Sequence, residues 1–162
     1  MIQDMKKTIG CLEQKPGVEC IVHSLGSDEK VAQRLAQMGV FPGVTLQIVR
    51  IASFGATVEV SIDGSQNFAI RKGELTALNC QVVAMPLTSS DVQLHITYRI
   101  RTVSGGRRFQ QRMEAQGIHR GLLVKINNRT SPRIELHLID QKKIVKLGPG
   151  EAEKIIIEIT DV

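Results

Sequence analysis

Three cysteines and four histidines are the residues of this chain best suited to hold a metal ion. Cys20 and His23 are three positions apart, but on an extended strand this spacing directs the two side chains to opposite faces. Cys20 and Cys80 both occupy apolar positions of alternating patterns, where a free cysteine commonly packs as a small apolar residue. No histidine lies four positions from another. We therefore predict no built-in metal site; a folded site that joins His23 to a distant carboxylate is the alternative.

Sequence patterns of common catalytic and nucleotide-binding sites are missing. The chain has no GxxxxGK[ST] phosphate loop, no HExxH zinc motif, no GxSxG nucleophile turn and no CxxC pair. The stretch GPGEAE at 148–153 lacks the third glycine of a dinucleotide-binding turn, and we expect a strand after it rather than a helix. We predict a protein with no catalytic residues, no metal ligands and no required cofactor.

The net charge of +5 is distributed unevenly along the chain. Residues 1–86 contain eight Lys/Arg and eight Asp/Glu, whereas residues 87–162 contain thirteen Lys/Arg and eight Asp/Glu. The whole excess of five positive charges therefore lies in the second half. Such asymmetry predicts that this half contacts something acidic, with a merely solvated surface as the alternative interpretation.

Neither a membrane span nor a secretory signal is visible. No stretch approaches the roughly 18 apolar residues that a spanning helix needs. The first ten residues include two lysines but no apolar segment follows them. Three widely spaced cysteines argue against a disulfide framework, so we expect a reducing, cytoplasmic location.

One short phrase occurs twice in the chain, as RLAQMGVFPG at 34–43 and as RMEAQGIHRG at 112–121, 78 residues later. The first glycine of each phrase follows a stretch of helical periodicity, where a chain that turns with positive φ favours glycine. The second glycine suits the left-handed position of a turn that leads into a strand. The four glycines for which we predict this structural role are Gly39, Gly43, Gly117 and Gly121.

Alternating apolar residues flank both phrases and predict half-buried strands. In the first half they include Val18, Cys20, Val22, Leu46, Ile48, Val58, Val60 and Ile62, and in the second half Ile96, Tyr98, Ile100, Val124, Ile126, Ile134, Leu136 and Leu138. Five short strands and one short helix in about 75 residues are typical of a small barrel. We predict a mainly β protein of two tandem SH3-like small β-barrels, each with one short α-helix, over residues 1–84 and 85–162.

Five arginines of the second half are candidates for a basic docking surface. Two of them alternate on a predicted strand and so face the same way, two precede the predicted helix and one follows it. They are Arg99, Arg101, Arg107, Arg108 and Arg120. Nucleic acid is a disfavoured partner, because the aromatic residues left to stack on bases, Phe41 and Phe54, lie in the neutral half.

The order of these features resembles the ferrous iron transport protein A family, FeoA. The resemblance is carried over about residues 9–84 by GVECIVHSL, then QRLAQMGV followed by PG, and a closing AIRKGELTALNCQVV. A looser second copy over about residues 87–160 keeps QRMEAQGIHRG and KLGPGEAEKIIIEI. The usual member of this family has one barrel, whereas this chain has two.

The resemblance implies a small cytoplasmic, non-enzymatic protein that works with FeoB, a membrane GTPase that imports ferrous iron. It also implies an alternative function, because the same fold forms the terminal domain of metal-dependent repressors, where it is linked to weak transition-metal binding, iron included. The positive half adds the anionic surface of a membrane as a further candidate partner. The family has no catalytic residues to transfer to this chain.

Overall fold

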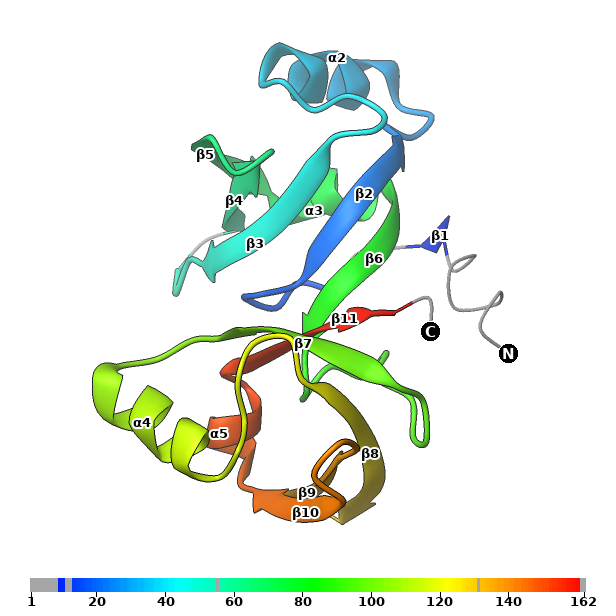
Figure 1. Cartoon of the computed structure of the whole chain (residues 1–162). Coiled ribbons are helices and arrows are strands. Elements are labelled where there is room, and N and C mark those ends of the chain that lie inside the picture. The colour runs from blue at the N-terminus through cyan, green and yellow to red at the C-terminus, as the bar shows by residue number, and fades with distance from the viewer. Residues whose placement is uncertain (1–8, 11–12, 55, 131, 161–162) are drawn as a thin grey trace. The chain divides into compact units, whose positions relative to one another are not determined.

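The computed structural model describes residues 9–10, 13–54, 56–130 and 132–160. The chain divides into two compact units, Met1–Val83 and Ala84–Val162, which are drawn in blue to green and in green to red in Figure 1. The boundary expected from the sequence lay one residue later, after residue 84.

The first unit is a curved sheet with two helices. Its strands pair in the order β6-β2-β3-β4-β5, and the two-residue strand β1 adds to β6. The strands are β1 (Ile9–Gly10), β2 (Glu19–Ser24), β3 (Thr45–Ile51), β4 (Thr57–Ile62), β5 (Gln66–Arg71) and β6 (Asn79–Pro86). The helices are α2 (Glu29–Gln37) and α3 (Lys72–Thr76).

The second unit repeats this topology. Its strands pair in the order β11-β7-β8-β9-β10, and the last residues of β6, from Ala84 to Pro86, pair with β11. The strands are β7 (Tyr98–Val103), β8 (Leu123–Thr130), β9 (Arg133–Leu138), β10 (Lys143–Leu147) and β11 (Ile155–Ile159). The helices are α4 (Arg107–Ala115) and α5 (Pro149–Ala152).

The predicted fold class, mainly β and SH3-like, is confirmed by this repeated five-strand order. Among the described residues the strand pairings form an open path, so the hydrogen-bond ladder of neither unit closes into a ring. Both units also contain the same irregularity in strand pairing. The β3–β4 register shifts between Ile48 and Arg50, and the β8–β9 register shifts between Ile126 and Asn128. Both shifts occur at the same offset of 78 residues, so both units bend the same strand at the same place.

The core of each unit consists of the alternating residues that the sequence pattern selects. Each of the sixteen flanking residues named for the pattern is buried except Ile96, which is half-buried. Leu35 of α2 and Met113 of α4 are fully buried and occupy corresponding positions. Each unit therefore packs the same helix face against its own sheet. Within the described ranges no helix is long and apolar enough to cross a membrane.

The repeated phrase ends both long helices with the same hydrogen bonds. In the first unit the amide of Gly39 donates to Ala36 O at 3.0 Å, and that of Val40 donates to Leu35 O at 3.0 Å. The corresponding bonds of the second unit join Gly117 N to Glu114 O at 2.9 Å and Ile118 N to Met113 O at 2.8 Å. This pair of bonds defines a Schellman end, in which the residue after the glycine folds back on the last helical turn.

The second half of the phrase is a turn that ties the helix to the first strand. Gly43 has a φ of 93° and Gly121 a φ of 90°, the left-handed conformation that the third residue of a type II turn requires. Gly43 N donates to Val22 O, and Gly121 N donates to Ile100 O, each at 2.8 Å. The phrase therefore specifies a helix stop and the entry into β3 or β8.

Each unit also has a second, shorter helix that the sequence pattern did not indicate. Helices α3 and α5 have five and four residues, too few to show a 3.6-residue period. In each, a glutamate accepts a hydrogen bond from the backbone amide that precedes the helix, satisfying one of the amides left without a partner at a helix start. The bonds are Arg71 N to Glu74 Oε1 and Gly148 N to Glu151 Oε1, both 3.2 Å.

These glutamates explain the arginine that opens the repeated phrase. Arg34 Nε lies 3.4 Å from Glu74 Oε2, and Arg112 Nη2 lies 3.6 Å from Glu151 Oε2. An arginine on the long helix thus pairs with a glutamate on the short helix in both units. The sequence pattern alone does not indicate this pairing.

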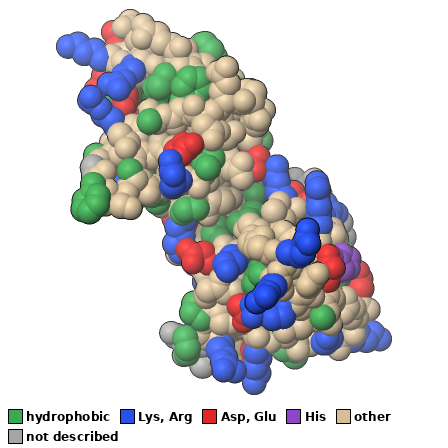
Figure 2. All heavy atoms as spheres, turned by 90° about the vertical axis from the view of Figure 1, so that its left-hand side faces the viewer, with side chains coloured by type: hydrophobic (Ala, Val, Ile, Leu, Met, Phe, Trp, Pro, Cys, Tyr) green, Lys and Arg blue, Asp and Glu red, His purple; other side chains and the backbone are tan. Residues whose placement is uncertain are grey.

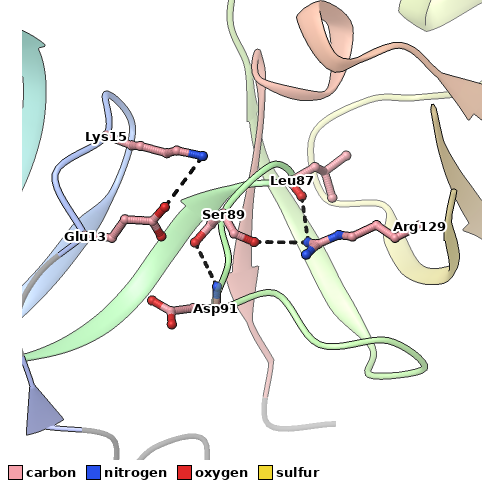
Figure 3. Close-up of polar contacts among 6 residues, drawn as sticks. All are labelled: Glu13, Lys15, Leu87, Ser89, Asp91 and Arg129. Carbon is pink, nitrogen blue, oxygen red and sulfur yellow. Dashed lines mark hydrogen bonds and ion pairs between the residues drawn. The ribbon is translucent and has the colours of Figure 1, made fainter. Parts of the chain in front are cut away.

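The segment that follows β6 is held against the second unit by polar contacts, drawn in Figure 3. The guanidinium of Arg129 donates to Leu87 O at 3.1 Å and to Ser89 O at 3.0 Å. The backbone amide of Asp91 donates to Ser89 Oγ at 3.2 Å. Backbone groups of a connecting segment need such partners when they leave water, so this segment is an ordered part of the unit.

Candidate partner-binding site

Arg99 and Arg101, predicted to face the same way, do so and share one carboxylate. The Nη1 atom of Arg99 lies 3.8 Å from Glu158 Oε1, and that of Arg101 lies 3.9 Å from Glu158 Oε2. Glu158 belongs to β11, the strand that pairs with β7. One carboxylate thus lies near two guanidiniums, and all three side chains are partly exposed.

The other three candidate arginines lie at opposite ends of α4. Arg107 and Arg108 are its first two residues, and Arg120 lies in the turn after its end. A helix of nine residues is about 14 Å long, so the two ends are separate surfaces. Figure 2 shows Lys and Arg side chains at several places on the visible face, with acidic side chains between them.

Two of the five arginines line a recess of about 240 Å³ beside α4 and β7. We call it the arginine recess, and define it by its lining residues. These are Arg101, Thr102, Val103, Gln110, Glu114, Ile118, His119 and Arg120. The recess exists because Gly121 N bonds to Ile100 O and so holds the turn with Arg120 beside the strand with Arg101.

Several lining residues of the arginine recess are held in place by hydrogen bonds. The Gln110 amide nitrogen donates to Val103 O and to Gly105 O, both at 3.3 Å, which ties α4 to the end of β7. A ring nitrogen of His119, Nδ1, lies 3.0 Å from Arg120 O. Gln110, Glu114 and His119 were not selected from the sequence. Alignment of the two copies at the offset of 78 could have revealed them, because their counterparts Ala32, Ala36 and Phe41 are apolar.

The cysteine and histidine candidates are separated as the strand spacing predicts. Cys20 and Cys80 are buried free thiols, whereas His23 is exposed and lies 3.2 Å from Gln81 Oε1. A hydrogen bond to Cys80, together with burial, raises the pKa of the Cys20 thiol far above its usual range, and the same bond lowers the pKa of Cys80. A thiol that stays protonated is a poor metal ligand. Among the residues with a described position, no three His, Cys, Asp or Glu side chains gather in a way that could hold a metal ion.

A second recess, of about 560 Å³, lies in the first unit along β3, β4 and β5. Its charged residues are already paired, since Arg50 Nη2 lies 2.9 Å from Glu59 Oε2 and Asn67 donates to Glu59 Oε1 at 3.0 Å. Phe68 and Ala69 complete its lining. A ligand that bound here through charge would have to displace this close ion pair, so the arginine recess is the better candidate.

Comparison with known proteins places the first unit in a family. The family model for the FeoA domain matches residues 12–82, which covers nearly all of the first unit. No curated protein gives a significant match to the chain.

Solved structures of proteins with related names are also similar to the chain. Iron(II) transport protein A from Clostridium thermocellum is 29% identical, with 90% of this chain and 84% of that chain covered and a TM-score of 0.48. An iron uptake regulatory protein, FeoA, is 28% identical, with 46% and 97% covered and a TM-score of 0.40. A FeoA-like protein from Clostridium acetobutylicum is 23% identical, with 46% and 85% covered and a TM-score of 0.41. Because these TM-scores are below 0.5, no argument rests on these structures, and the similarity to the FeoA family is the match of the family model to residues 12–82.

Proposed function

We propose that this protein is a non-enzymatic accessory or regulatory protein of ferrous iron uptake. In this role it acts in the cytoplasm by binding a FeoB-type membrane GTPase. The observation that carries the proposal is the FeoA domain over residues 12–82. The second unit, which repeats the same strand order, extends the surface available for a partner.

The contacts of the charged and nucleophilic side chains support a binding role over catalysis. Glu74 and Glu151 cap short helices and pair with arginines, and Cys20 is a buried thiol. General acid–base catalysis needs a titratable group within hydrogen-bond reach of a substrate. Groups that are already used to join structural elements do not meet this need.

The direct test is binding between the full-length chain and the purified cytoplasmic GTPase domain of a FeoB-type transporter from the same organism. We expect saturable binding that weakens as salt rises, because the excess positive charge of residues 87–162 contributes through screened electrostatics. Absence of saturable binding at low and at physiological salt would overturn the proposal. Binding to phosphatidylserine vesicles but not to this domain would instead identify the membrane surface as the partner.

Removal of metal ions with a chelator distinguishes this proposal from the alternative, a metal-linked regulatory function. Each unit has an apolar core, and each fully buried large aliphatic side chain contributes about 1.5–3 kcal/mol, so we propose that the fold needs no resident metal. Circular dichroism melts of the full chain with and without EDTA should overlap. A large fall in melting temperature with EDTA would favour the metal-linked function.

A further inference from the structure

Strand β5 of the first unit has an open edge. It pairs with β4 along its whole length, from Ile62 opposite Gln66 to Thr57 opposite Arg71. In the part of the chain that the structure describes, no strand pairs with the other side of β5, which lies at the edge of the first unit in Figure 1. Most residues of β5 are exposed at the surface. The strand therefore presents one side of its backbone to solvent.

The hydrogen bonds of β5 show which backbone groups face this open edge. In an antiparallel pair, alternate residues exchange hydrogen bonds with the neighbouring strand. Because Lys72 N donates to Ala56 O at 2.7 Å, residues 68 and 70 direct their backbone groups to β4, whereas Asn67 and Ala69 direct theirs to the open edge. Among the described residues, the backbone N–H and C=O groups of Asn67 and Ala69 have no hydrogen-bond partner. Such groups are a template for pairing with a further strand.

The other end strand of the pairing order, β10, is protected where β5 is not. Strand β10 carries two exposed lysines, Lys143 and Lys146. Lysines on an edge strand oppose pairing with another chain, since two such strands bring like charges together. In β5 the residues from Gln66 to Ile70 carry no charge. Charge therefore does not oppose the pairing of a second strand with β5.

The charges at the two ends of β5 are complementary. Arg71 ends the strand and Lys72 follows it, whereas Asp63 lies in the turn before it. Arg71 and Asp63 are exposed, and within the described ranges neither has an ion-pair partner. On the neighbouring strands, Arg50 and Glu59 pair with each other at 2.9 Å. If two copies of β5 pair in antiparallel fashion, the basic end of each lies beside the acidic end of the other.

We propose that β5 pairs with β5 of a second copy of this chain, which forms a dimer about a two-fold axis. In the register that uses the open groups, Asn67 lies opposite Ala69 of the second copy, and each such pair exchanges its N–H and C=O groups. A register shifted toward Arg71 would lose a bond, because Arg71 N already donates to Glu74 Oε1. Phe68 then faces Phe68 of the second copy at a non-hydrogen-bonded position, where side chains approach most closely. This inference is independent of the proposed function.

The test measures the mass of the full-length chain by sedimentation equilibrium from micromolar to near-millimolar concentration. Wild type should pass from the mass of one chain to that of two. Ala69→Pro removes a donor at the open edge and should weaken the dimer at least about tenfold, whereas Ala69→Ser keeps the donor and should change its affinity less than about twofold.

The charges are tested by a second pair of variants. Arg71→Gln removes both contacts with Asp63 and should weaken the dimer roughly two- to tenfold. Arg133→Gln removes the same charge from an exposed position at the start of β9 and should change its affinity less than about twofold. Circular dichroism melts identify variants that do not fold. Ala69→Lys, which keeps every bond to β4 and places like charges across the new pair, replaces Ala69→Pro if the proline variant unfolds.

Hydrogen exchange locates the contact. The amides of Asn67 and Ala69 should exchange more slowly as the concentration of wild type rises. The inference is overturned by a single-chain mass at every concentration, by protection elsewhere in place of β5, or by a dimer that Ala69→Pro and Ala69→Lys leave unchanged. It is also overturned if Arg71→Gln weakens the dimer no more than Arg133→Gln does. If wild type stays a single chain and the transporter domain slows exchange in β5, the strand binds a segment of that partner and not a second copy.

Discussion

The ends of α2 and α4 have the same hydrogen bonds but different surroundings. At the first, a Cβ added to Gly39 would meet nothing within 4 Å. At the second, Gln141 donates to Gly117 O at 3.0 Å and Lys143 donates to Gln116 O at 3.1 Å, so residues of the β9–β10 hairpin cover the helix end. The backbone hydrogen bonds that both units share are what this fold requires of a helix end. The contacts from Gln141 and Lys143 are an addition of the second unit.

The two ion pairs that join the long helix to the short helix differ in how exposed their glutamates are. The side chain of Glu74 is 8% exposed and that of Glu151 is 34% exposed, although the arginine partner is about equally distant in both. A carboxylate that is more withdrawn from water depends more on its partner. The same contact is therefore expected to matter more in the first unit.

The largest effects should come from the helix residue that both units bury completely. Leu35→Ala and Met113→Ala should each lower the free energy of unfolding by about 2–5 kcal/mol, because each removes a fully buried side chain and leaves a cavity. Met113→Leu, which nearly conserves volume, is the control and should cost less than about 1.5 kcal/mol. A loss below about 1 kcal/mol in either alanine variant would contradict the shared core.

The single tyrosine allows the two units to be measured separately. The chain has no tryptophan, and its only tyrosine, Tyr98, is buried in the second unit. Tyrosine fluorescence therefore follows unfolding of that unit, while far-UV circular dichroism follows both. Met113→Ala should shift the fluorescence transition to lower denaturant. Leu35→Ala should shift the part of the dichroism transition that fluorescence does not report.

Alanine at the helix-ending glycines should separate backbone strain from bracing. Both glycines have positive φ, 95° for Gly39 and 87° for Gly117, where a side chain costs about 1–2 kcal/mol. At Gly117 the new Cβ would also displace Gln141 and its hydrogen bond, which adds about 0.5–1.5 kcal/mol. Gly117→Ala should therefore destabilise more than Gly39→Ala, and Gln141→Ala alone should account for the difference. Equal losses would show that the brace contributes nothing.

Much of the fold follows from local sequence patterns. Alternating residues select the core, and the two glycines of each phrase indicate a helix end and a turn. The short helices α3 and α5 were not predicted, because four or five residues show no period. The roles of Arg34 and Arg112 were not predicted either, since their glutamate partners lie about 40 residues further along the chain.

The candidate site could be predicted only in part for a related reason. That Arg99 and Arg101 face the same way follows from strand alternation alone. That Arg101 and Arg120 line one recess, while Arg107 and Arg108 do not, depends on where the turn docks on β7. Docking is a long-range contact, which the spacing of residues in a sequence does not specify.

The ion-pair comparison predicts a smaller, unequal pair of effects. Arg34→Ala should cost about 1–2 kcal/mol, because it leaves the withdrawn carboxylate of Glu74 without its partner, although half of the arginine is exposed to solvent. Arg112→Ala should cost less than about 1 kcal/mol, since Glu151 is more exposed. On a Glu74→Gln background, Arg34→Ala should cost clearly less, which a double-mutant cycle in denaturant measures. An unchanged cost on that background would mean that Arg34 acts through packing rather than charge.

A further small effect at neutral pH concerns Tyr98, which also makes the second unit respond differently to high pH. Burial raises the pKa of this phenol, an effect that the hydrogen bond from the Gln93 amide offsets only in part. The unfolded chain releases this proton near pH ~10, whereas the folded unit still holds it at that pH. The contribution of Tyr98 to the free energy of unfolding is therefore fully present below pH ~10 and is lost as the pH rises further. Tyr98→Phe should cost about 0.5–1.5 kcal/mol at pH ~7 by loss of the hydrogen bond. It should also make the unfolding midpoint of the second unit less sensitive to pH above ~10 than that of wild type, as followed by circular dichroism.

Phenolate absorbance of the folded wild type should rise only well above the pH at which the denatured chain titrates. Coincident titration of the folded and denatured chains would show that the hydroxyl of Tyr98 remains in contact with water.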